Sequence, residues 1–162
     1  MTIAFFGHRQ IFNEQVIKER IEKILKEYVC QNDAKMLIGC HGEFDHLALQ
    51  TSINYKKKEN ENIKINVVLT NLSYLNKDEL GFSRVDNYKN LGCETIFYDI
   101  EEIHFKKRIT ASNKKMVDES DLIICYVDMN TYKSGAKTTI LYAIKQNKKI
   151  INLFNESIDL YN

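Results

Sequence analysis

Short apolar runs alternate along this chain with longer stretches in which apolar residues recur every three or four positions. The short runs predict buried strands at 2–6, 36–38, 63–69, 95–98, 121–127 and 149–154. The longer stretches predict helices at 13–28, 42–55, 83–91, 105–119 and 136–146. Residues 70–82 fit neither pattern, and the charged residues 56–62 predict a solvated helix end and turn.

Four of these helices have further expected features. Asn13 is expected to cap the first helix, with Glu14 in its first turn, and Gly92 is expected to close the helix at 83–91. One face of the second helix is predicted to carry Phe44, Leu47, Ala48, Thr51 and Tyr55. One face of the helix at 105–119 is predicted to carry Phe105, Ile109, Ser112 and Met116.

The regular alternation of strands and helices predicts an α/β fold. We expect a single Rossmann-like three-layer domain over residues 1–162, with a mostly parallel sheet and helices on both faces. Ligands of such sheets bind at the carboxyl ends of the strands. The loops to inspect are therefore Gly7-His8-Arg9, the Gly39–Gly42 turn and the loop at 128–139.

The first two of these loops join glycine to groups that can bind anions. Gly7 is followed directly by His8 and Arg9, and the turn from Gly39 to Gly42 leads into a helix. A glycine turn at a helix amino terminus exposes backbone N–H groups that suit a phosphate. The spacing is not that of a GxGxxG fingerprint, so a plain tight turn between strand and helix remains the alternative.

The loop before the last helix is rich in hydroxyl groups. Ser134, Thr138 and Thr139 supply hydroxyls, Gly135 allows close approach of the backbone, and Lys137 supplies charge. A Walker A sequence is absent. These residues are predicted to bind a ligand, and the alternative is an ordinary helix start with Ser134 as its cap.

Composition narrows the function classes. The chain has 23 Lys and Arg residues against 22 Asp and Glu residues, and this near-neutral balance argues against a nucleic-acid partner. The four cysteines form no CxxC pair, which is typical of reduced intracellular thiols. No apolar run resembles a signal peptide or approaches a membrane span, so we expect a cytoplasmic protein without a membrane partner.

A metal or cofactor is not expected. Cys40, His41, Asp45 and His46 are close in sequence, but the two histidines are five positions apart and the spacing matches no familiar zinc pattern. Catalysis by Cys40 beside His41 is equally unsupported, since neighbours in sequence need not face each other.

Three stretches together resemble a known family. MTIAFFGHR, IGCHGEFDHLA and NKKMVDESDLIICYVDMNTYKSGAKTTILYAI are similar to the YpsA-like (DUF1273) group of the SLOG superfamily, over nearly the whole chain. The superfamily also contains the DNA-processing protein DprA and the LOG phosphoribohydrolases. The resemblance implies a Rossmann-like fold with a pocket for a nucleotide or an ADP-ribose-type ligand at the strand ends.

The residues that match the family, and are therefore expected in the ligand site, are Gly7, His8, Arg9, Gly39, Gly42, Asp45 and Asn113. Two departures count against the hydrolytic activity of the LOG members. Ser112 stands where the family usually has an arginine, and Thr138 and Thr139 stand where the hydrolases have a catalytic glutamate. Hydrolysis of an N-glycosidic bond needs a carboxylate, and Glu43 and Asp45 are the weak candidates to supply it.

The sequence therefore leaves several functions open. A nucleotide sensor or signal-sequestering protein is preferred, and the alternative is an enzyme resembling a phosphoribohydrolase or a nucleoside deoxyribosyltransferase. Binding of single-stranded DNA, as in the DprA branch, is the weakest hypothesis, because no aromatic stripe accompanies a basic patch. The resemblance also implies a homodimer.

Overall fold

A six-stranded sheet forms the centre of the computed structural model, which describes residues 1–30, 32–98 and 102–154. Its strands are β1 (Thr2–Gly7), β2 (Lys35–Ile38), β3 (Lys64–Val68), β4 (Glu94–Ile96), β5 (Leu122–Tyr126) and β6 (Lys149–Asn152). Every pairing in the sheet is parallel, and the strand order is β4-β3-β2-β1-β5-β6. The order reverses direction between β1 and β5, which is the topological switch point where doubly wound sheets bind ligands.

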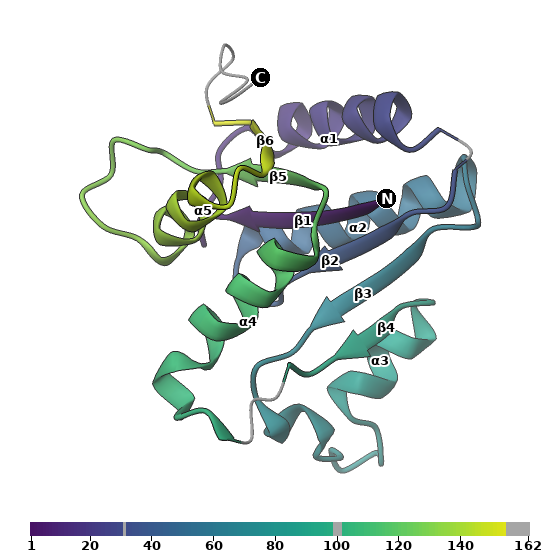
Figure 1. The fold of residues 1–162 in the computed structure, drawn as a ribbon. Helices are drawn as coiled ribbons and strands as arrows, with labels where there is room; N and C mark the ends of the chain where they lie inside the picture. Colours follow the sequence, from purple (N-terminus) through teal and green to yellow (C-terminus); the bar gives the residue numbers. More distant parts are fainter. Residues whose placement is uncertain (31, 99–101, 155–162) are drawn as a thin grey trace.

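Helices cover both faces of this sheet (Figure 1). They are α1 (Glu14–Tyr28), α2 (Glu43–Lys58), α3 (Arg84–Asn90), α4 (Phe105–Glu119) and α5 (Gly135–Lys145), with a short 3₁₀ helix, η1 (Leu72–Leu75). Side chains of α1 and α2 join one core with Phe5 and Ile38, whereas α4 and α5 join a second core with Phe6 and Leu37. Because successive side chains of a strand point to opposite faces of the sheet, they belong alternately to the two cores.

The α/β class and the Rossmann-like architecture predicted from the sequence are confirmed. Each predicted strand and helix occurs, with boundaries shifted by one or two residues at most ends. The short helix α3 also begins and ends as expected: Ser83 and Asp86 form a capping box, and Gly92 adopts a φ of 78°. Among the described residues, no helix is long and apolar enough to cross a membrane.

Two local expectations are met only in part. Asn13 does occupy the cap position of α1, but its φ is 57° and its side chain makes no capping hydrogen bond. In α4, Ser112 and Met116 on the predicted face are buried, whereas Phe105 is 65% exposed and Ile109 is 39% exposed. The first half of α4 extends past the sheet core, where apolar spacing alone no longer implies burial.

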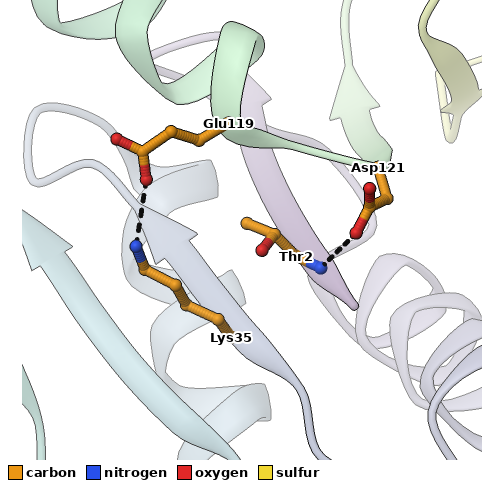
Figure 2. Close-up of polar contacts among 4 residues, drawn as sticks. All are labelled: Thr2, Lys35, Glu119 and Asp121. Atoms are coloured by element: carbon orange, nitrogen blue, oxygen red, sulfur yellow. Dashed lines mark hydrogen bonds and ion pairs between the residues drawn. The ribbon is translucent and has the colours of Figure 1, made fainter.

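The amino-terminal edge of the sheet is held by the end of α4 (Figure 2). Asp121 Oδ2 accepts a hydrogen bond of 2.7 Å from the Thr2 backbone N–H, and the Asp121 N–H donates to the Thr2 carbonyl at 2.8 Å. Nearby, Glu119 forms an ion pair of 3.0 Å with Lys35 at the start of β2. Part of the family-like MVDESD segment is therefore structural, and lies at the opposite edge of the sheet from the strand-end loops.

We expect Asp121→Ala to lower the free energy of unfolding by about 1 to 2 kcal/mol, because the charged acceptor of the Thr2 N–H is lost. Glu119→Gln should cost less than about 0.5 kcal/mol, since its ion pair with Lys35 is solvent-exposed. Chemical denaturation of both variants measures the difference. Equal losses of unfolding free energy in the two variants would show that the carboxylates stabilise this edge only by their negative charge, and not through the hydrogen bond to Thr2.

Candidate functional site

A cavity of about 540 Å³ opens at the carboxyl ends of β1 and β2. Its walls come from the three strand-end loops and from α4. Nine of the predicted site residues line it: Gly7, His8, Arg9, Gly39, Gly42, Asp45, Asn113, Ser134 and Gly135. The volume is within the range of ordinary small-molecule sites.

Three glycines let the first two loops pack against each other. A Cβ at Gly7 would lie 2.3 Å from Phe44 Cγ, and one at Gly42 would lie 2.9 Å from the Arg9 Cα. A Cβ at Gly39 would lie 2.8 Å from a carboxylate oxygen of Asp45. None of these contacts leaves room for a side chain, so the glycines are needed for close approach rather than for an unusual backbone conformation.

The loop after β1 places one histidine and one arginine at the cavity. His8 Nε2 accepts a hydrogen bond of 2.8 Å from the Asp128 backbone N–H, which ties the loops after β1 and β5 together. In a neutral imidazole this bond puts the ring proton on Nδ1. Arg9 is exposed, and it forms no ion pair within the described part of the chain, so its guanidinium is available to an anion.

Asp45 contributes a carboxyl group to the cavity from the first turn of α2. Its Oδ2 accepts a hydrogen bond of 2.9 Å from the His41 backbone N–H. Burial raises the pKa of Asp45, and the hydrogen bonds from the His41 and Gly42 backbones only partly oppose this effect. The charged form of Asp45 is therefore less favourable in the folded protein than in the unfolded chain.

Asp45→Asn should stabilise the protein at pH 7. Between the ordinary pKa of 3.8 and the raised pKa of folded Asp45, the folded state binds more protons than the unfolded state, so stability falls as pH rises through that window. The gain from Asp45→Asn should therefore vanish near pH 3.8 and grow with pH, by at most about 1.4 kcal/mol per pH unit. Thermal unfolding of both proteins across this range measures it. A variant that is less stable at every pH would mean that the carboxylate is structural.

Glu43, the other candidate acid, is engaged elsewhere. Its Oε2 accepts a hydrogen bond of 2.9 Å from the Ile11 backbone N–H, and its own N–H donates to the Arg9 carbonyl at 2.9 Å. It does not line the cavity. Glu43 thus fixes the loop after β1 against α2, and Asp45 is the sole carboxylate on the cavity wall among the described residues.

The start of α5 forms the third loop of the site. Ser134 caps the helix by accepting a hydrogen bond of 3.0 Å from the Lys137 N–H, which was the alternative interpretation of this residue, and Ser134 and Gly135 also line the cavity. No atom lies within 4 Å of a Cβ built on Gly135, so a ligand can approach this backbone.

The last three predicted residues do not line the cavity. Lys137 Nζ donates to the Thr131 carbonyl at 2.7 Å, and Thr138 Oγ1 donates to the Ser134 carbonyl at 3.0 Å. Thr139 Oγ1 accepts a hydrogen bond of 3.1 Å from Asn113 Nδ2 and so positions the amide of Asn113. These residues shape the helix start instead of facing the space where a ligand would lie.

Sequence reasoning missed several cavity residues. Phe5, Phe6, Ile109, Thr110, Met116 and Ala136 add mostly apolar surface, and His41 adds an imidazole. His41 Nε2 lies 2.9 Å from Thr70 Oγ1, and burial, followed by the charge of Arg9, lowers the pKa of His41. Ile109 is partly exposed because it forms part of the cavity wall. This role depends on how α4 packs across the sheet, so it could not be predicted from the sequence.

The cavity thus combines three chemistries. Apolar side chains can pack against a ring, Asp45 can accept hydrogen bonds from hydroxyl groups, and Arg9 with the start of α5 can hold an anion. Among the described residues no group of three or more His, Cys, Asp or Glu side chains is arranged to hold a metal ion.

The structure is that of an α/β protein with a cavity at the carboxyl ends of β1 and β2, beside the switch point of a parallel sheet. No protein-family model matches the chain, and no curated protein matches it with significant similarity. The resemblance to the YpsA-like group consequently stays a prediction from the residues quoted above.

Proposed function

We propose that this protein binds a nucleotide or an ADP-ribose-type derivative in the cavity at the ends of β1 and β2, hereafter the main cavity. We propose that it acts as a sensor or a signal-sequestering protein. One observation supports this most strongly: the cavity at the switch point is lined by nine of the twelve residues predicted to bind such a ligand. The cavity has a different group for each part of a nucleotide. Apolar residues of α4 suit the base, Asp45 suits the ribose hydroxyls, and Arg9 suits a phosphate.

Binding without turnover is favoured by the positions of the acids. Hydrolysis at a glycosidic carbon typically uses two carboxylates, one to protonate the leaving group and one to activate water or attack. Glu43 is held by the Ile11 N–H outside the cavity, so Asp45 is the sole carboxylate on the wall within the described part of the chain. A bound ligand would then be retained rather than cleaved.

Isothermal titration calorimetry with AMP, ADP-ribose and cyclic ADP-ribose tests the proposal. We expect saturable binding of at least one of them with a stoichiometry of one per chain. Absence of heat for the whole set, with the protein shown to be folded by circular dichroism, would overturn the proposal. The homodimer that the resemblance implies is tested separately, by sedimentation equilibrium at several protein concentrations.

A second candidate function is cleavage or transfer at a nucleotide N-glycosidic bond, with Asp45 as the acid. The raised pKa of Asp45 favours it, because a general acid must retain its proton near the working pH. Incubation with nucleoside monophosphates, followed by chromatography for free base, tests this function. Release of base that is lost in Asp45→Asn but kept in Glu43→Gln would make the protein an enzyme.

A further inference from the structure

A second cavity, of about 300 Å³, lies between α2 and α3. It shares the turn after β2 with the main cavity, since Gly39, Gly42 and Asp45 line both. Its remaining wall includes the side chains of Gln50 on α2 and of Arg84, Asn87 and Tyr88 at α3. None of these four residues belongs to the nucleotide site described above.

Arg84 is the cation of this second cavity. Its guanidinium carbon lies 4.3 Å from the centroid of the Tyr74 ring, a distance at which the ring face attracts a cation. Burial acts to lower the pKa of Arg84, but the neighbouring Tyr88 and Tyr74 hydroxyls outweigh it and raise the pKa. Arg84 therefore stays charged, and the ring of Tyr74 restricts its orientation.

This cation has no counter-ion in the described parts of the chain. Arg84 takes part in neither of the two ion pairs found there. The neighbouring Cys40 thiol supplies no negative charge, because burial raises its pKa to about 11. Asp45 lies on the shared wall, but burial raises the pKa of its carboxyl group and so favours the neutral form. The Arg84 guanidinium is accordingly left without an ion-pair partner among the described residues.

The other polar groups of the cavity can donate hydrogen bonds. Gln50 and Asn87 have amide N–H groups, and Tyr88 has a hydroxyl group. A guanidinium that shares a cavity with such donors can recognise the oxygen atoms of a phosphate group. Arg84 keeps access to solvent, so an anion can reach it without a conformational change.

We propose that this second cavity is a separate anion site that takes the phosphate group of a small molecule, with Arg84 as the cation and Gln50 and Asn87 as further donors. The site does not depend on the nucleotide site, because Arg9 and the start of α5 take no part in it. A ligand bound there would contact the turn that also forms a wall of the main cavity.

The test is a titration of the ¹⁵N-labelled protein with inorganic phosphate, followed by NMR. We expect saturable shifts of the Arg84 side-chain Nε–H resonance and of the Asn87 and Tyr88 amides. Arg84→Gln should weaken the response at Asn87 and Tyr88 by about tenfold or more, because a charged hydrogen-bond donor is lost. Tyr74→Leu should weaken it by about two- to fivefold, since the stacking that orients Arg84 is removed.

Lys89→Gln is the matched control, because Lys89 is an exposed cation on the same helix that does not line the cavity. It should leave the phosphate affinity unchanged. The proposal is overturned if the Arg84 resonance does not shift, or if Lys89→Gln weakens binding as much as Arg84→Gln does. Shifts at Gly135 and Ala136 report the main cavity in the same spectra, so failure of either site is seen independently. Arg84→Lys, which keeps the charge, serves as the second variant should Arg84→Gln fail to fold.

Discussion

Gly7→Ala is expected to lower the free energy of unfolding by about 3 kcal/mol, the upper end of the usual cost of overpacking a core. The added methyl would lie 2.3 Å from Phe44 Cγ. Phe44 is fully buried and stacks on Tyr126, with ring centroids 6.2 Å apart, so it has little room to move away. In a chain of this length the loss corresponds to a melting temperature lower by roughly 6 to 12 °C.

Gly135→Ala is the matched control for this prediction. A Cβ at Gly135 meets no atom within 4 Å, and alanine is a better helix residue than glycine, so the variant should be as stable as the native protein or more stable. Thermal and urea unfolding of both variants provides the comparison. A Gly7→Ala protein within about 0.5 kcal/mol of the native value would show that the β1–α2 contact can relax, and that Gly7 is not required for packing.

Arg9→Ala is expected to weaken the binding of ADP-ribose by about 100-fold or to abolish it. A hydrogen bond from a charged donor contributes roughly 1.5 to 3 kcal/mol, and no other arginine or lysine lines the main cavity within the described residues. The melting temperature should stay nearly unchanged, because Arg9 is exposed and its side chain makes no hydrogen bond or ion pair in the described chain.

Lys23→Gln controls for the general effect of charge on a negatively charged ligand. Lys23 is exposed on α1 and does not line the main cavity, so its loss should change the affinity by less than twofold at physiological salt. Calorimetry with ADP-ribose, paired with thermal unfolding, separates the outcomes. A large loss of stability in Arg9→Ala would assign Arg9 a structural role, and an unchanged affinity would place the phosphate elsewhere.

The two proposed anion sites differ in the contacts that orient their arginine side chain. Arg9 has no partner within the described residues, so binding would have to order its side chain at an entropic cost. Arg84 is already oriented by the ring of Tyr74. Preorganisation of this kind improves affinity by reducing the cost of binding. The smaller cavity is therefore expected to bind free phosphate at least as well as the larger one.

Some residues of the family-like MVDESD segment stabilise the fold, and others line the main cavity. Met116 lines the main cavity, whereas Asp121 binds the backbone of Thr2 at the other edge of the sheet. Asp118 accepts a hydrogen bond of 2.8 Å from the Tyr142 hydroxyl and so joins α4 to α5. One motif can therefore contain both structural residues and cavity residues, because a helix that crosses the sheet reaches from one edge of the sheet to the other.

The alternation of apolar runs and helical spacing was enough to predict the architecture. A parallel strand such as β5 is buried on both faces, so Leu122, Ile123 and Ile124 form an uninterrupted apolar run that is easily recognised. The positions of the strand-end loops then follow from the right-handed connections between parallel strands. Gly7, Arg9 and Gly39 could be assigned to one edge of the sheet on this basis alone.

Only the tertiary structure decided which side chains face the cavity. Glu43 and Asp45 are two positions apart and equally plausible as acids, yet the helix turns Glu43 toward Ile11 and Asp45 toward the His41 N–H. The positions of Lys137 and Arg84 could not be predicted from the sequence either. Lys137 donates to the Thr131 carbonyl, and Arg84 lines a cavity that no sequence motif indicates. Sequence periodicity determines where the strands and helices lie and which loops follow the strand ends. The direction of a polar side chain depends on its hydrogen-bond partner, which can be near in the chain, as His41 is to Asp45, or distant, as Ile11 is to Glu43. Which partner is reached is fixed only when the loops and helices pack on the sheet.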